Sequence, residues 1–212
     1  GGTPWEYPQR YFENSPIYNI DKIQSLNNSK AYLFQLLKTY NFTDWKEISS
    51  LMNAQSGKQI VSSSHRLLKN RSQLILSKLN QTETTSISID ASQSLVSIPN
   101  KAFDLKMEVV TSIGPKEQDV VYLDFKSLKF PLTLRNWTPG DYFCPSGMHG
   151  KKKLSKYFKD EKFSLIEKEN TLIIYSGDAV VWVIGRRADQ RFIAIETSPK
   201  ILKISILQNA NS

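Results

Sequence analysis

The sequence is poor in the residues that build disulfides and metal sites. Its 212 residues include one cysteine, Cys144, so no internal disulfide can form, which fits a reducing compartment and a cytoplasmic location. The two histidines, His65 and His149, have no cysteine or carboxylate at a metal-ligand spacing. We therefore expect no metal site in this chain.

Signals for membranes, nucleotides and catalysis are also absent. No apolar run approaches the roughly 20 residues that span a bilayer, and the first ten residues show no signal-peptide pattern, so we expect no membrane-spanning segment. Neither G-x-x-x-x-G-K-S/T nor G-x-G-x-x-G occurs. A thiol nucleophile formed by Cys144 and His149 would lack an orienting carboxylate. The sequence thus predicts no catalytic residue in this chain.

The composition is that of a folded, basic protein. Hydrophobic residues make up 40% of the chain and aromatic residues 11%, enough for a substantial core. The net charge of +8 favours an anionic partner, either nucleic acid or a membrane surface. Position 1 is Gly rather than Met, from which we expect a fragment of a longer chain.

The first part of the chain has a helical pattern. Residues 1–20 hold three prolines among aromatic residues, which predicts an extended leader. Apolar residues at helical spacing predict a helix within 28–40, and a capping-box pattern predicts another starting at Asp44. Residues 59–63 and 73–77 are typical of short strands, with 65–71 as a polar connection. We expect a small domain of two helices and a hairpin over 21–80.

The second part has the period of two that is typical of strands. Residues 80–86 lack core formers, and we place a linker over 81–94, although Ile87 and Ile89 already alternate with serine and aspartate. A mainly β domain over 95–212 follows, with a hairpin at 173–183 around Gly177-Asp178. Further strands are expected at 193–195 and 201–206, with one helix near 154–159. The predicted fold class is α+β.

One stretch combines flexible turns with clustered cations. The sequence RNWTPGDYFCPSGMHGKKKLSKYFKD covers residues 135–160. Its loop-shaping residues can bring backbone N–H groups close to an anion: Gly140, Asp141, Gly147 and Gly150. Lysines 151 to 153 are expected at a helix start, where the dipole disfavours cations and a bound phosphate would reverse that cost. The alternative is a solvated charged surface.

A second basic cluster follows the predicted hairpin. It contains Arg186, Arg187 and Arg191, whose guanidinium groups suit phosphate and RNA edges. The alternative is a turn paired with Asp178, Asp189 or Glu196. Tryptophans usually indicate core, but Trp137 lies beside Arg135 in the glycine-rich stretch, so an RNA or interface role is the hypothesis for that residue.

The string TPGDYFCPSGMHGKKKLSKYFKDEK resembles the C-terminal signature of the tRNA(Ile)-lysidine synthase family. The segment from Trp182 to Arg187, followed by Arg191-Phe192, is similar to the rest of that signature. The strings YLFQLLKTYNF and AQSGKQIVSSSHRLLKNRSQLIL resemble the family's middle domain. One departure concerns an Arg-Asp pair of the family, which is absent from the segment near Glu167.

This resemblance implies a parent enzyme that uses ATP to join lysine to the wobble cytidine of tRNA(Ile) with a CAU anticodon. The chain would hold the middle domain, which binds the tRNA body, and the C-terminal domain, which binds the acceptor stem. The C-terminal domain would be a three-layer sandwich that resembles a module of the phenylalanyl-tRNA synthetase β subunit. The implied tRNA-binding residues are Arg135, Lys151, Lys152, Lys153, Lys156, Arg186, Arg187 and Arg191.

The resemblance places the chemistry outside this chain. The family's Ser-Gly-Gly-x-Asp-Ser loop does not occur in the sequence, so ATP, magnesium and lysine would bind to an N-terminal domain, and this chain alone would be inactive with no cofactor. A homodimer is a further expectation from the family, and no membrane partner is expected. The alternative function is a protein-protein interaction or dimerisation module whose basic loop is merely solvated.

Overall fold

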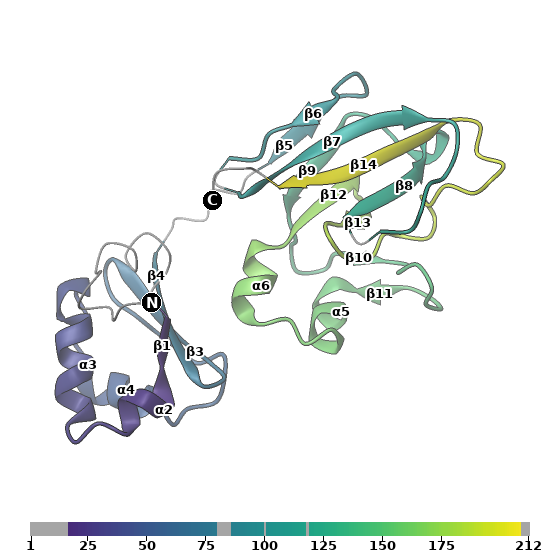
Figure 1. The fold of residues 1–212 in the computed structure, drawn as a ribbon. Coiled ribbons are helices and arrows are strands. Elements are labelled where there is room, and N and C mark those ends of the chain that lie inside the picture. Colours follow the sequence, from purple (N-terminus) through teal and green to yellow (C-terminus); the bar gives the residue numbers. More distant parts are fainter. Residues whose placement is uncertain (1–16, 80–85, 100, 118, 209–212) are drawn as a thin grey trace. The chain divides into compact units, whose positions relative to one another are not determined.

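The computed structural model describes residues 17–79, 86–99, 101–117 and 119–208 (Figure 1). The chain divides into two compact units between Glu83 and Thr84, and each is described by itself. Helices and antiparallel sheets are mixed, as the predicted α+β class requires. None of the described helices has the length and apolar character needed to cross a membrane.

The first unit packs short helices against a four-stranded antiparallel sheet. Its helices are α2 (Ile20–Gln24), α3 (Ser29–Leu37), the 3₁₀ helix η1 (Lys38–Tyr40) and α4 (Trp45–Leu51). Its strands are β1 (Ile17–Asn19), β2 (Gln59–Val61), β3 (His65–Asn70) and β4 (Gln73–Lys78), in the order β1-β4-β3-β2. Asn28 and Asp44 cap α3 and α4 by accepting backbone N–H groups, which fixes where these helices begin.

The core of the first unit lies between the helices and the sheet. Leu33 and Leu37 of α3 are fully buried, as are Ile48 and Leu51 of α4. They pack with buried leucines of β3 and β4, such as Leu67. The predicted helical spacing is therefore correct, because the same apolar residues form the buried stripe.

Two predictions for the first unit need correction. Residues 65–70 are not a polar connection but strand β3, which pairs with both β2 and β4. The strand has polar residues at both ends but a buried centre, which is why its polar ends suggested a connection. Even Lys69 is buried, and its ammonium donates to the carbonyl of Met52. The predicted leader ends in strand β1, paired with β4, and residues 1–16 lie outside the described part.

The second unit contains two four-stranded antiparallel sheets and one two-stranded sheet. The first sheet has the order β13-β12-β9-β5, with β5 (Ile87–Ile89), β9 (Leu132–Asn136), β12 (Leu172–Ser176) and β13 (Ala179–Val183). The second has the order β6-β7-β14-β8, with β6 (Leu95–Val96), β7 (Phe103–Val110), β8 (Val120–Asp124) and β14 (Ile201–Gln208). The small sheet pairs β10 (Tyr142–Phe143) with β11 (Lys152–Lys153), and a 3₁₀ helix, η2 (Phe125–Ser127), follows β8.

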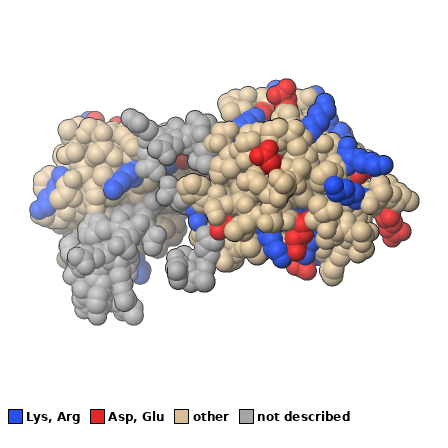
Figure 2. All heavy atoms as spheres, turned by 90° about the horizontal axis from the view of Figure 1, so that it is seen from above, with Lys and Arg blue, Asp and Glu red and all other residues tan. Residues whose placement is uncertain are grey.

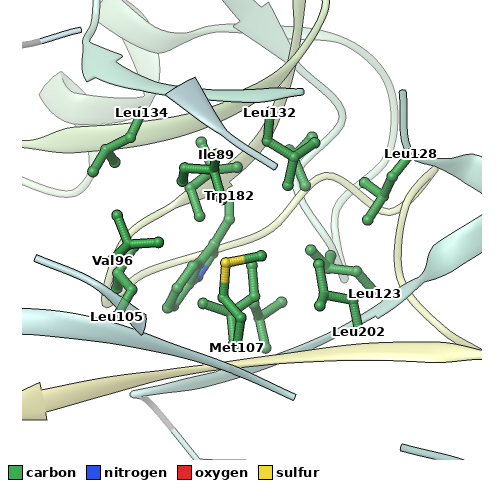
Figure 3. Close-up of a cluster of buried hydrophobic side chains, with 14 of the residues drawn as sticks. Ile89, Val96, Leu105, Met107, Leu123, Leu128, Leu132, Leu134, Trp182 and Leu202 are labelled. Carbon is green, nitrogen blue, oxygen red and sulfur yellow. The ribbon is translucent and has the colours of Figure 1, made fainter. Parts of the chain in front are cut away.

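The two large sheets share one core. Trp182 of β13 is almost completely buried among side chains of the opposite sheet, including Leu105, Met107 and Leu202 (Figure 3). Leu132 and Leu134 of β9, which is in the same sheet as β13, belong to the same core. Alternating residues therefore define this interface, as expected for two packed antiparallel sheets.

The other face of the first large sheet is covered by helices. Strand β12 is buried along its whole length, with Ile174 in the core between the sheets and Ile173 on the opposite side. There Ile173 packs with Tyr157 and Phe158 of α5 (Leu154–Asp160). A second short helix, α6 (Leu165–Asn170), follows α5 along the chain (Figure 1). The expected helix near 154–159 and the hairpin at 173–183 are both present.

Three further predictions differ from the structure. The linker expected over 81–94 contains strand β5, because Ile89 is a core residue of the second unit. Residues 193–195 form no strand beyond a single bridge between Ile193 and Leu123. Helix α6 was not predicted, although Ser164 and Glu167 form a complete capping box. Each of these segments is too short for its periodicity to be decisive.

Candidate nucleic-acid interface

The turn that starts the glycine-rich loop is held by one carboxylate. Asp141 accepts hydrogen bonds from the Tyr175 hydroxyl at 2.6 Å and from the Thr138 N–H at 2.7 Å. The Arg135 guanidinium lies 3.3 Å from the same carboxylate. Burial alone would raise the pKa of Asp141, but these bonds outweigh it and keep the pKa below its ordinary value. Asp141 thus holds together the turn at the start of the loop.

The three predicted loop glycines have the conformation that favours glycine. Gly140, Gly147 and Gly150 have φ angles of 103°, 75° and 79°. At Gly147 a Cβ would lie 3.7 Å from the Arg187 guanidinium, an ordinary contact, so backbone conformation rather than space disfavours other residues there. The loop path therefore depends on these positions.

Long-range backbone contacts bring the second basic cluster against this loop. The Ser146 N–H donates to the Ala188 carbonyl at 2.9 Å, and the Gln190 N–H donates to the Cys144 carbonyl at 2.8 Å. The Arg187 guanidinium donates to the Ser146 carbonyl at 3.0 Å. The two clusters found separately in the sequence therefore form one surface, which we call the basic surface and define by residues 141–156 and 186–191.

A fully buried carboxylate ties the two segments together. Asp189 has no exposed surface and accepts the Cys144 N–H at 2.9 Å. It also accepts two guanidinium hydrogen bonds from Arg191, at 2.7 and 3.0 Å. These bonds raise the pKa of Arg191 further and satisfy the buried charge. The pairing with Asp189 that was considered for this cluster is present for Arg191.

The three lysines lie directly before the first turn of helix α5, as predicted. Helix α5 begins at Leu154, and the Leu154 N–H already donates to the Asp141 carbonyl at 2.9 Å. Lys152 and Lys153 belong to strand β11, so their side chains leave the backbone in alternate directions. The predicted placement of lysines at a helix start is therefore confirmed, with Lys153 as the N-cap residue of α5 and without a side-chain cap bond.

The eight predicted cations divide into two groups. Arg135 is mostly buried, with its guanidinium 3.7 Å from the centre of the Tyr175 ring, and Lys152 forms a 2.8 Å salt bridge with Asp160. With Arg191, these two are engaged by carboxylates. The remaining five are exposed and form no salt bridge within the described ranges: Lys151, Lys153, Lys156, Arg186 and Arg187.

Two of these exposed cations lie over aromatic rings. The Lys151 ammonium is 3.2 Å from the centre of the Tyr142 ring, and the Arg186 guanidinium is 4.8 Å from that of Phe163. Tyr142 is itself exposed. Such contacts hold the cations at the surface while leaving their charge available.

Trp137 has a structural role. It is half-buried, packs edge-on against Phe158 at 5.4 Å and donates its indole N–H to the Lys168 carbonyl at 2.9 Å. That bond fastens α6 to the end of β9, so the hypothesis of an RNA contact has no support from this geometry.

Cys144 is half-buried beside the basic surface, and the described residues contain no group of three potential metal ligands.

The first unit carries a positive charge from which no site was predicted. Residues 17–79 hold nine lysines and arginines against three aspartates and glutamates, a difference of six, but no site residue was predicted there. On the face of the larger unit seen in Figure 2, basic and acidic side chains are interspersed. Counting charge by domain would have revealed the first unit as the more uniformly basic one.

Comparisons with known proteins agree with these two units. The family model described as "TilS substrate binding domain" matches residues 13–79, and "TilS substrate C-terminal domain" matches residues 132–205. A solved structure described as "Crystal structure of TILS C-terminal domain" has a TM-score of 0.51 at 23% identity, covering 60% of this chain and 100% of its own. That likeness concerns the fold.

Two curated relatives are similar over most of the chain. The tRNA(Ile)-lysidine synthase of Parabacteroides distasonis is 42% identical over 182 residues, which is 84% of this chain and 41% of the relative. That of Bacteroides thetaiotaomicron is 30% identical over 191 residues, 89% of this chain and 42% of the relative. The chain therefore spans about two fifths of their length, and it belongs to the tRNA(Ile)-lysidine synthase family as its substrate-binding and C-terminal domains.

Proposed function

We propose that this chain is the tRNA-binding part of a tRNA(Ile)-lysidine synthase and that its basic surface contacts the phosphates of the acceptor stem. The observation that carries the proposal is the meeting of two basic clusters, joined by the hydrogen bonds of Ser146 and Gln190. Their meeting places exposed cations from two distant segments on one surface, where a single phosphate backbone could contact both. The names of the relatives supply the RNA class.

The exposed cations suit a shape-reading contact. An A-form stem is recognised mainly through phosphates and 2′-hydroxyls, which need cations at fixed positions rather than base-reading side chains. Lys151 and Arg186 are held by aromatic rings, and Arg187 by the Ser146 carbonyl. Such contacts supply affinity and register but carry no base code. The proposed acceptor is tRNA(Ile) with a CAU anticodon.

The chemistry is proposed to lie in the part of the relatives that this chain does not match. There ATP with magnesium would activate the wobble cytidine and lysine would be joined to it, while the chain described here would hold the tRNA and catalyse nothing by itself. A cytoplasmic location and a homodimer belong to the same proposal. In the second unit, one large sheet packs against the other on one face and against helix α5 on its opposite face. This layering supports the expected three-layer likeness to a phenylalanyl-tRNA synthetase module.

A charge-removal experiment tests the proposal. The triple variant Lys151/Lys153/Arg187→Ala removes three exposed cations of the basic surface without touching the carboxylate-bound ones. We expect weaker tRNA binding and a slope of log affinity against log salt that falls by roughly one for each phosphate that is no longer neutralised. The matched control is Lys116/Lys126/Lys129→Ala, which removes three exposed lysines elsewhere in the same unit.

Equal tRNA affinity and salt slope in the two triple variants would contradict the assignment of the basic surface. Gel filtration of the wild-type chain separates the alternative function. A tight dimer that binds no RNA at any salt concentration would favour an interaction module in place of the tRNA-binding role.

A further inference from the structure

A groove between two helices of the first unit is the strongest feature that the basic surface does not explain. It is about 330 Å³ in volume and is lined by residues of α3 and α4: Lys30, Leu33, Phe34, Trp45, Lys46 and Ser49. This volume is at the lower end of the roughly 300–1,000 Å³ of small-ligand sites. The groove is therefore large enough for a planar organic group.

Two aromatic rings form the apolar part of the groove. Phe34 and Trp45 meet edge to face, with ring centres 4.7 Å apart. Phe34 is 43% exposed and is the only exposed aromatic residue among residues 17–79, whereas Leu33 beside it is buried. An exposed ring supported by a buried neighbour on a helix is a rigid platform that costs little entropy to use.

The charges around these rings are all positive. Lys30 and Lys46 line the groove, are exposed and form no salt bridge among residues 17–79, and no carboxylate lines it. Glu47, the acid next along α4, faces Lys58 at 3.7 Å. Aromatic rings flanked by cations match a ligand that has both a flat π-face and neighbouring negative charges, which is the chemistry of a nucleotide in a single strand.

We propose that the groove between α3 and α4 binds an unpaired base of an RNA ligand. The base stacks on the exposed ring of Phe34, which Trp45 meets edge to face and holds in place, and Lys30 and Lys46 neutralise the phosphates on either side of the base. The inference rests on the proposed function, because it requires an RNA partner. It adds a second contact in the first unit, which recognises an unstacked nucleotide instead of a paired stem.

The test uses the whole chain and two RNA probes with the same number of phosphates, a blunt duplex and a stem with a single-stranded tail. The main variant is Phe34→Leu, which keeps an apolar side chain in the groove but removes its π-face. We expect affinity for the tailed RNA to fall about tenfold, the loss of one stacked base, and affinity for the duplex to stay unchanged. Leu26→Ala, another exposed apolar residue of the same unit, should change neither affinity.

The lysines give an independent measurement. Lys30/Lys46→Ala should weaken binding of the tailed RNA and lower its salt slope by up to about two, whereas Lys22/Lys38→Ala should do so less. Unchanged urea midpoints would show that these variants are folded. The proposed base-binding role of the groove is wrong if Phe34→Leu binds the tailed RNA as tightly as wild type does, or if its affinity for both RNAs falls equally.

These outcomes are separable from failure of the tRNA-binding role. If Phe34→Leu bound RNA as wild type does while Lys151/Lys153/Arg187→Ala bound it more weakly, the inference about the groove would be wrong and the role of the basic surface would be retained. Absence of RNA binding by wild type would overturn both. Loss of binding to an acidic helical peptide in Phe34→Leu, with RNA binding intact, would overturn the inference in favour of a protein partner.

Discussion

At the scale of single residues, carboxylates behind the basic surface determine which cations stay free. Asp141, Asp160 and Asp189 each hold one cation, and the first and last of them also hold backbone N–H groups of the loop. Their charge therefore organises the backbone, while the exposed lysines and arginines keep theirs.

Replacing Asp189 by Asn should destabilise the second unit by about 2 kcal/mol. The amide keeps the shape of the side chain but weakens the charge-assisted bonds to Arg191 and the Cys144 N–H, each of which is worth roughly 1.5–3 kcal/mol to a charged group. Urea denaturation measures the loss. Glu117→Gln, an exposed carboxylate of the same unit, is the control and should change stability by less than about 0.5 kcal/mol. Equal stability of the two variants would refute the role of Asp189.

Asp141 should make stability depend on pH in the acid range. Its pKa is lower in the folded protein than the ordinary value of 3.8, so the folded state binds the proton less readily than the unfolded state. The stabilisation is complete above the ordinary pKa and is lost as the pH falls through the folded value. Urea midpoints measured between neutral pH and acid should therefore fall less in Asp141→Asn than in wild type. Parallel curves for the two proteins would contradict this.

At the scale of elements, strand β12 connects the two hydrophobic layers of the second unit. Its alternate residues face the opposite sheet and α5, so the position of the basic surface depends on a strand that is buried on both sides. Helix α5 contributes three buried side chains in seven residues: Leu154, Tyr157 and Phe158. Packing rather than capping holds this helix, because the cap residue Lys153 makes no side-chain cap bond.

Truncating Phe158 to Ala should cost about 3–5 kcal/mol, because it opens a cavity at a site with no exposed surface. Trp137 packs on this ring, so its fluorescence should shift as α5 loosens. The matched control is Lys159→Ala, which removes an exposed side chain of the same helix. A Phe158→Ala protein with the unfolding midpoint of the control would show that α5 is not fastened by this residue.

Elements with a strong local signal could be predicted from the sequence. The hairpin at 173–183 has two apolar runs around Gly177-Asp178, and α4 has its cap at Asp44, so both were found. Strand β3 was missed because burial of Lys69 depends on the distant Met52 carbonyl. Strand β5 has only three residues and gains its stability from pairing with β9. Non-local partners decide such segments.

The candidate site shows the same limit. Turn chemistry located the loop glycines and Asp141, since a positive φ and a carboxylate that accepts N–H groups are local properties. The contact between Ser146 and Ala188 depends on how β13 returns past the loop, which no local pattern contains. The engagement of Arg135 by Tyr175 is likewise a tertiary feature. Sequence therefore identified the basic residues but not which of them remain free.

At the scale of the whole molecule, positive charge is divided between two units with separate cores. The first unit carries an excess of six over residues 17–79, and the second carries the basic surface. Two basic modules on one chain can bind the same long anion at once, in which case the second contact is intramolecular. The proposed function therefore predicts that the intact chain has a higher tRNA affinity than two separate weak sites would give.

The intact chain should bind tRNA more tightly than either unit alone. Residues 1–83 and 84–212, expressed separately, should each bind weakly and with strong salt dependence, while the whole chain gains an affinity of about 10²–10⁴-fold over the better unit. Filter binding of the three proteins to one tRNA over a salt series measures this gain. An equimolar mixture of the two separate units is the control, because it has the same charges without the covalent connection. If the whole chain bound no better than the mixture, the two units would not engage one tRNA together, and one unit alone would account for recognition.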